Sequence, residues 1–259
     1  MTRILHAFGV TIEIVADQTD LFPLLEARLP PLVPPGDAEP TIRYTVTTSA
    51  SGQRVAVRGR RTVVMADSLD TLCDHLVTDL QSELARAAHG WTFIHAGVVA
   101  IDGRAIVLPA PSGGGKTTLV AALIRSGAEY ASDEFAVIDR LARVHPYARP
   151  LRVRTPGQRL RSVPAAELGA ASVKAGVPIG VVLFVDYQPS GFFETSLLPG
   201  GRVAAGLLRH CLGARGRPRE TLRALRLVTT IAPGCAGTRG DAAAAAEQIL
   251  ARARSGEWA

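Results

Sequence analysis

The sequence predicts an α/β fold preceded by a small α+β unit, and three features of the chain lead to this prediction. Residues 104–108 form a short apolar run that leads directly into a glycine-rich stretch. Residues 116–124 then have helical spacing with no glycine or proline, and residues 178–185 form another apolar run of strand length. Strand-like runs that alternate with helical segments are typical of α/β proteins. A chain of 259 residues is long enough for one large domain, or for a core domain with an appendage.

Residues 1–90 are predicted to form the α+β unit. Val10, Ile12 and Ile14 alternate with polar residues, as in a half-buried strand. A strand over 41–48, a hairpin over 54–65 and an amphipathic helix from residue 69 to Gly90 complete this unit. No residue pattern in it indicates chemistry, so we expect a scaffold or a substrate-docking unit. The core domain is then expected to span residues 91–259.

The order of elements in the core follows from the same signals. Asp102-Gly103 predicts a hairpin between strands 92–101 and 104–108. The remaining strands are expected within 129–138 and at 151–154, 178–185 and 227–231. Helices are expected at 164–170, 203–211, 219–225 and 241–254.

Composition narrows the classes of partner. The net charge of +6 and a pI near 9.8 favour an anionic ligand. Aromatic residues make up only 5% of the chain and do not interleave with a basic stripe, so no nucleic-acid partner is expected. Three separated cysteines form no zinc or disulfide pattern and suit a reducing cytoplasm. The longest apolar stretch, 175–185, is too short to span a bilayer, so we expect a cytoplasmic protein without a membrane partner. Composition leaves a homo-oligomer open.

The glycine-rich stretch is the main functional signal. Ala110-Pro-Ser-Gly-Gly-Gly-Lys-Thr-Thr118 stands between a strand and a helix, which is the context of a phosphate-binding loop (P-loop, or Walker A motif). Alanine replaces the usual first glycine. Glycines let successive N–H groups point into one concavity, and the helix N-terminus adds partial positive charge there. Lys116 is predicted to reach the β- and γ-phosphates, and the Thr117 hydroxyl to bind Mg²⁺. The predicted nucleotide-binding residues are Ser112, Gly113, Gly114, Gly115, Lys116, Thr117 and Thr118.

A nucleotide site of this kind needs a carboxylate near the metal, and the sequence offers two candidates. Asp133-Glu134 follows the loop helix by one strand. Asp186 ends the apolar run Val181-Val-Leu-Phe-Val185, which is the pattern of a Walker B strand. On pattern alone Asp186 is the neater match, although an aspartate that opens a turn after a strand would look the same.

Over residues 92–140 the chain resembles the bacterial HPr kinase/phosphorylase family. His95, then the loop ending in Lys116-Thr117, and then Ser132-Asp-Glu134 stand in that family's order. The chain is most similar to the shorter HPr-kinase-related proteins, some of which accompany lasso peptide gene clusters. The resemblance implies a P-loop kinase core of the HPr kinase/phosphoenolpyruvate carboxykinase type, with a mixed central sheet. The chain lacks the family's Glu-Ile-Arg-Gly motif, so the resemblance does not extend to HPr itself or to reverse phosphorolysis.

The resemblance also implies roles for individual residues. Asp133 is expected to accept the proton of an attacking hydroxyl, and Glu134 to hold Mg²⁺ together with Thr117. His95 is expected to orient Asp133 or to offset charge on the γ-phosphate. Lys116, Asp133 and His95 are therefore the predicted catalytic residues. Arg149, Arg152 and Arg154 are candidates for clamping the phosphoryl group.

The resulting hypothesis is a kinase that uses ATP and Mg²⁺ to phosphorylate a hydroxyl, here a serine of a peptide or small carrier protein. A small-molecule hydroxyl is the alternative acceptor, and GTP or pyrophosphate the alternative donor. Two other classes of protein fit the same sequence, an ATPase or switch without a phosphorylated product and a silent nucleotide-binding module. A lyase of the phosphoenolpyruvate carboxykinase type ranks last because such chains are much longer.

Overall fold

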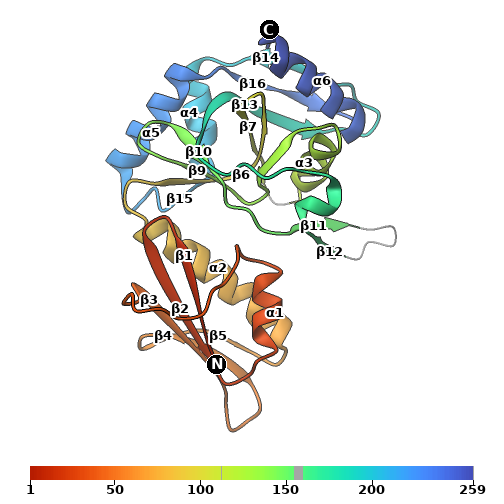
Figure 1. Ribbon diagram of the computed structural model, residues 1–259. Helices are drawn as coiled ribbons and strands as arrows, with labels where there is room; N and C mark the ends of the chain where they lie inside the picture. Colours follow the sequence, from red (N-terminus) through yellow and green to blue (C-terminus); the bar gives the residue numbers. More distant parts are fainter. Residues whose placement is uncertain (112, 155–159, 259) are drawn as a thin grey trace. The chain divides into compact units, whose positions relative to one another are not determined.

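The computed structural model describes residues 1–111, 113–154 and 160–258. By its internal contacts the chain divides into two compact units, Met1–His89 and Gly90–Ala259 (Figure 1). Both units combine helices with sheets, and the larger sheet contains parallel and antiparallel strand pairs. The prediction of a mixed α/β protein is therefore confirmed.

The first unit is a sheet with helices packed against it. Its strands are in the order β1-β2-β3-β4-β5, and only β2 and β3 pair in parallel. The leucines of α2 at positions 72, 76, 80 and 84 recur every four residues, so they form one buried face of that helix. The bounds are β1 (Thr2–Ala7), β2 (Val10–Ala16), α1 (Leu21–Glu26), β3 (Ile42–Thr48), β4 (Arg54–Arg58), β5 (Arg61–Ala66) and α2 (Leu69–Ala87).

The second unit is built on a larger mixed sheet, in which the main path of described strands is β10-β9-β6-β7-β13-β16-β14. β8 and β15 both pair with β6, and β11 pairs with β12 in a separate ribbon. The strands are β6 (Thr92–Ile101), β7 (Arg104–Pro109), β8 (Glu129–Ser132), β9 (Phe135–Ile138), β10 (Arg143–His145), β11 (Leu151–Arg154), β12 (Leu160–Val163), β13 (Val177–Tyr187), β14 (Glu194–Leu197), β15 (Cys211–Leu212) and β16 (Gly234–Arg239). The helices are α3 (Lys116–Arg125), η1 (Ala165–Leu168), α4 (Gly200–Arg209), α5 (Pro218–Ile231) and α6 (Ala242–Ser255).

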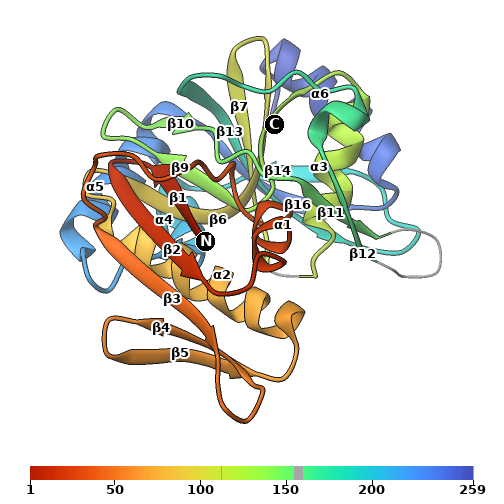
Figure 2. The ribbon, with the colours of Figure 1, turned by 60° about the horizontal axis from the view of Figure 1, so that its bottom comes forward.

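Helices cover both faces of this sheet, as the two views of the ribbon show (Figures 1 and 2). Ile106 and Leu108 of β7 pack into the same core as α3 and α6. Ala105 and Val107, which alternate with them, pack into the core formed with α4 and α5. This alternation explains why β7 is apolar along its whole length rather than at every second residue.

The sheet places several strand ends beside the glycine-rich loop. β13 pairs in parallel with β7 on one side and with β16 on the other. The carboxyl ends of these strands therefore lie at one edge of the sheet, which is where open α/β sheets bind ligands. β7 leads into the loop at this edge, and α3 begins directly after the loop.

One predicted element is wrong. The sequence suggested a strand over residues 227–231, but these residues form the last turn of α5. The strand begins three residues later as β16, whose sequence Gly-Cys-Ala-Gly-Thr-Arg lacks the β-branched pattern typical of strands. Small residues are needed here because a Cβ at Gly234 would lie 2.3 Å from Val203 of α4, and one at Gly237 would lie 1.8 Å from the Glu194 carbonyl.

In the part of the chain that the structure describes, no helix is both long enough and apolar enough to cross a membrane.

Candidate active site

The loop between β7 and α3 has backbone conformations that require glycine. Gly113 has φ 85° and Gly115 has φ 74°, both in the left-handed region. The Gly114 N–H donates to the Pro111 carbonyl at 3.2 Å, which closes the turn. Gly115 is the N-cap of α3, so the free N–H groups of the first helical turn lie at the loop. Ser112 was also predicted to bind phosphate, but it lies outside the described residues.

The structure places His95 beside Lys116. The Nζ of Lys116 lies 2.9 Å from Nε2 of His95, and the imidazole also hydrogen-bonds to the backbone of Ala110. A glycine in β6 permits this approach, because a Cβ at Gly97 would lie 2.5 Å from Val120 and 3.2 Å from Cγ of Lys116. The glycine therefore lets the start of α3 lie against β6.

The structure also joins Thr117 to Asp133. The Thr117 hydroxyl donates to Oδ2 of Asp133 at 2.7 Å. Asp133 is 3% exposed, and its Oδ1 is buried without a hydrogen-bond partner among the described residues. The Ser132 hydroxyl shapes the turn that holds Asp133, because it accepts the N–H groups of Glu134 and Phe135 at 3.1 and 3.0 Å.

Glu134 is held by a different set of contacts. Its Oε2 accepts a hydrogen bond from Nη2 of Arg149, and its Oε1 lies 3.7 Å from Nε2 of His95. The Glu134 carbonyl accepts the N–H of Ala96 at 3.1 Å, which fixes the turn to β6. The carboxylate beside Thr117 is thus that of Asp133, whereas Glu134 faces His95 and Arg149.

These side chains line one cavity of about 610 Å³. His95, the loop, the start of α3, Asp133 and Glu134 contribute to its wall, as do Arg149 and Arg152. Side chains that are separated by up to 57 positions in the sequence therefore meet in one space.

Burial shifts the pKa values of the central groups. It lowers the pKa of His95 to about 4, and the Lys116 ammonium acts in the same direction. Burial raises the pKa of the Asp133 carboxyl to about 6, although the Thr117 hydroxyl and Lys116 act against it. Burial also lowers the pKa of Lys116, and Asp133 and Glu134 offset part of this effect. The imidazole is therefore neutral near pH 7, and its Nε2 can accept a hydrogen bond from the Lys116 ammonium.

The other sequence candidates lie in different surroundings. Asp186 is exposed near the end of β13 and is not among the residues that line the cavity. Arg149 and Arg152 do line it. Arg154 ends β11, but its side chain is outside the part that can be described.

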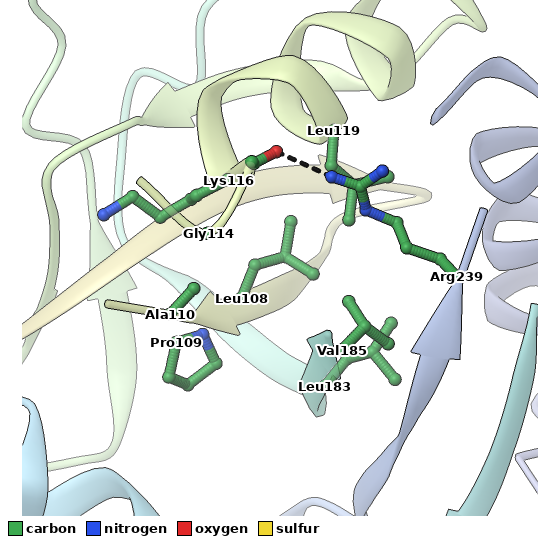
Figure 3. Close-up of a pocket in the computed structure, with 10 residues that line it drawn as sticks. Leu108, Pro109, Ala110, Gly114, Lys116, Leu119, Leu183, Val185 and Arg239 are labelled. Carbon is green, nitrogen blue, oxygen red and sulfur yellow. Dashed lines mark hydrogen bonds between the residues drawn. The ribbon is translucent and has the colours of Figure 1, made fainter. Parts of the chain in front are cut away.

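Sequence reasoning missed Arg239. This arginine is 3% exposed at the end of β16, and its Nη2 donates to the Gly115 carbonyl at 2.9 Å, as the dashed line in Figure 3 shows. Its guanidinium lies beside a small cavity of about 10 Å³ whose walls include the loop and Leu119. The sequence-based prediction placed the strand at 227–231 instead of at β16. Because β16 is the element that brings Arg239 to the loop, this residue was missed.

Comparisons with known proteins add a distant structural similarity. No protein-family model matches the chain. No curated protein matches it in sequence either. Among solved structures, the chain is similar to the Hpr(Ser) kinase/phosphatase from Coxiella burnetii, with 14% sequence identity and a TM-score of 0.37. The match covers 63% of this chain and 95% of that chain. Because this similarity is low, we base the proposed function on the geometry of the site.

Proposed function

We propose that the chain is a kinase that transfers the γ-phosphoryl group of ATP to a hydroxyl group. The observation that carries this proposal is that one cavity contains the glycine loop with Lys116, the Thr117–Asp133 pair, and Glu134 with Arg149. These are the parts that phosphoryl transfer requires, namely a phosphate cradle, a metal site, an acceptor for the hydroxyl proton and cations near the transferred group.

The loop and α3 would bind the phosphates. The N–H groups at the start of α3 point toward the loop, and the Lys116 ammonium lies in the same cavity. His95 would keep Lys116 in place before the nucleotide binds, because a neutral imidazole accepts a hydrogen bond without adding charge. Positioning and charge neutralisation of this kind provide most of the catalysis in phosphoryl transfer.

Thr117 and Asp133 fit a Mg²⁺ ion. Both offer oxygen atoms, which Mg²⁺ prefers, and the buried Oδ1 of Asp133 lacks a hydrogen-bond partner among the described residues. No group of three or more His, Cys, Asp or Glu side chains in the described ranges is arranged to hold a metal, so these two residues would hold the ion together with phosphate oxygens and water. A bound Mg²⁺ would supply charge neutralisation on the β- and γ-phosphates.

Glu134 would then accept the proton from the attacking hydroxyl. Arg149 donates a hydrogen bond to one of its carboxylate oxygens, so the group is oriented in the cavity wall, and the other oxygen lies on the side of His95. This assignment exchanges the roles that the sequence resemblance implies for Asp133 and Glu134. It is supported by the Thr117–Asp133 hydrogen bond and by the burial of Asp133, which leaves little room for an acceptor to approach.

The acceptor that we propose is a serine of a peptide or small protein, as in the enzymes whose motifs the sequence resembles. Residues 1–89 form a compact unit of their own that could bind such an acceptor. The nucleotide partner is proposed to be ATP, with Mg²⁺ as the metal.

Labelled ATP tests this function. The purified full-length protein is incubated with [γ-³²P]ATP, Mg²⁺ and a cell extract, and Lys116→Ala is the matched inactive control. A labelled peptide or protein that appears with the wild type and not with Lys116→Ala supports a protein kinase, and a labelled small molecule supports the alternative acceptor. Release of free phosphate without any labelled product, or no turnover of ATP, would contradict the proposal.

The exchange of roles has its own test. Asp133→Asn is expected to raise the Mg²⁺ concentration needed for half-maximal activity, whereas Glu134→Gln should lower kcat without changing this concentration. The reverse result would restore the assignment implied by the resemblance.

A further inference from the structure

Two aromatic side chains remain exposed in a molecule that buries most of its aromatics. Tyr187 is 55% exposed and Phe192 is 79% exposed. Every Phe, Tyr and Trp of the chain lies in the described ranges, and the aromatic side chains other than these two are buried or half-buried. They are five residues apart, at the end of β13 and in the segment that leads to β14.

Both aromatics lie at the edge of the sheet that carries the loop. Tyr187 pairs with Arg239 in the parallel register of β13 and β16. The carbonyl oxygen of Phe192 lies 3.5 Å from the Thr238 hydroxyl, so Phe192 is beside the end of the same strand. The ends of β13 and β16 are at the carboxyl edge of the sheet, where β7 enters the loop.

Arg239 connects this aromatic pair to the loop. Its guanidinium carbon lies 5.2 Å from the centre of the Tyr187 ring, and its Nη2 donates to the Gly115 carbonyl. A single guanidinium group therefore separates the ring of Tyr187 from the N-cap of α3. The guanidinium covers one side of the ring, and the large exposed fraction of Tyr187 leaves aromatic surface open to solvent.

The segment that carries Phe192 is fixed to the sheet. The Gln188 N–H donates to the Arg239 carbonyl at 2.8 Å, and a Cβ at Gly240 would lie 2.0 Å from the Gly191 carbonyl oxygen. The next residue, Phe193, is 5% exposed and packs under the guanidinium of Arg252. Phe193 thus anchors the segment on the inside while Phe192 points outward.

We infer that Tyr187 and Phe192 form the subsite for the purine base of the nucleotide whose phosphates bind at residues 113–118. This inference rests on the proposed nucleotide-binding role of the loop. Bases stack on aromatic rings through their π faces. The Arg239 guanidinium covers one face of the Tyr187 ring and fixes its orientation, so the ring can stack on a base without first being ordered. Stacking strength depends on the area of the ring rather than on its hydrogen-bonding groups. The subsite therefore accepts adenine and guanine and binds the smaller pyrimidines less well.

Comparison of ATP with inorganic tripolyphosphate tests the subsite directly, because tripolyphosphate carries the phosphates without a base. Affinities of the full-length protein for both ligands are measured by calorimetry with Mg²⁺ present. Wild type should bind ATP more tightly than tripolyphosphate. Tyr187→Ala and Phe192→Ala should each raise the Kd for ATP about tenfold and leave the Kd for tripolyphosphate unchanged.

Two control variants separate stacking from other effects. Tyr187→Phe keeps the ring and should bind ATP as the wild type does. Leu222→Ala removes an exposed apolar side chain from α5 and should change neither affinity. Circular dichroism confirms that each variant is folded.

Each remaining outcome decides the inference. Equal weakening of ATP and tripolyphosphate binding in Tyr187→Ala and Phe192→Ala would overturn the subsite while leaving the loop as a phosphate site. Unchanged ATP binding in a variant that carries both substitutions would do the same. Wild type that binds neither ligand would overturn both. Base-dependent binding in a protein that transfers no phosphate would retain the subsite and contradict the kinase proposal alone.

Discussion

Lys116 and His95 form a hydrogen-bonded pair of 2.9 Å at the mouth of the loop, although both side chains are bases. The pair is compatible because burial lowers the pKa of the imidazole to about 4 and so keeps it neutral near pH 7. The ammonium of Lys116 therefore has a neutral hydrogen-bond acceptor. Under the proposed function, a bound phosphate would replace this acceptor with a charged one, and His95 would act on the phosphate through Lys116.

Replacement of His95 should reduce turnover more than nucleotide binding. His95→Ala removes the acceptor that directs Lys116, so kcat is expected to fall about a hundredfold while the Kd for ATP changes less than about threefold. His95→Gln keeps an acceptor oxygen and should recover part of kcat. The exposed His75 of α2 provides the control, and His75→Ala should have no effect. Equal losses in His95→Gln and His95→Ala would contradict a positioning role.

The pKa shifts of His95 and Asp133 predict opposite effects of pH on stability. Between pH 4 and 6.5 the folded protein binds fewer protons at His95 than the unfolded chain does, so this site favours folding increasingly as pH rises. Between pH 3.8 and about 6 the folded protein binds more protons at Asp133, so this site favours folding less as pH rises.

Thermal unfolding in metal-free buffer separates the two sites. Relative to wild type, Asp133→Asn should gain Tm as pH rises from about 4 to 6, because only the His95 effect remains. His95→Gln should lose Tm relative to wild type over the same range. If the curves of Tm against pH are parallel for wild type, Asp133→Asn and His95→Gln, neither the His95 pKa nor the Asp133 pKa is shifted by burial.

Arg239 is expected to stabilise the loop. Arg239→Met removes a hydrogen bond from a buried charged group to the Gly115 carbonyl, so the free energy of unfolding should fall by about 2 kcal/mol. The Kd for tripolyphosphate should also rise, because Gly115 loses the contact that fixes the N-cap of α3. The exposed Arg202 of α4 is the matched control, and Arg202→Met should leave both quantities unchanged. Denaturant unfolding and calorimetry measure the two effects.

The distance between β6 and α3 should depend on Gly97. Gly97→Ala places a methyl group 2.5 Å from Val120 and 3.2 Å from Cγ of Lys116, so the free energy of unfolding should fall by about 1–3 kcal/mol and phosphoryl transfer should drop with it. Gly201 in the first turn of α4 has no atom within 4 Å of the corresponding position. Gly201→Ala should therefore be neutral or slightly stabilising, and a loss of stability like that of Gly97→Ala would indicate a general effect of added methyl groups.

The local signals in the sequence were sufficient for the loop and its flanking elements. Glycines followed by Lys116 and a breaker-free helix have few other structural interpretations, and the structure has β7, the loop and α3 at these positions. The sequence also indicated that His95 and Asp133-Glu134 belong with the loop, and all of them line its cavity. That expectation came from a resemblance in motif order, because nothing in local periodicity relates residue 95 to residue 133.

Tertiary packing determined what the sequence did not reveal. Residues 227–231 are apolar and β-prone, but they continue the buried face of α5 that includes Leu225 and Val228. β16 lacks a strand-like pattern because α4 and β14 approach it too closely for side chains at Gly234 and Gly237. The positions of Arg239 and Tyr187 depend on this strand, so the loop contact and the exposed aromatic pair could not be predicted without it.

The pairing of β6 changes along its length, and this change affects the dynamics of the site. Its first half pairs with β9 and β15 and its second half with β7 and β8, and His95 lies where these partners change. The amide of His95 donates to the His210 carbonyl, and the neighbouring amide of Ala96 donates to the Glu134 carbonyl. Opening of the strand at this point would release both contacts together, so hydrogen exchange at these two adjacent amides should report the free energy of local unfolding around His95 and Glu134. Nucleotide binding should slow exchange at both amides by the same factor.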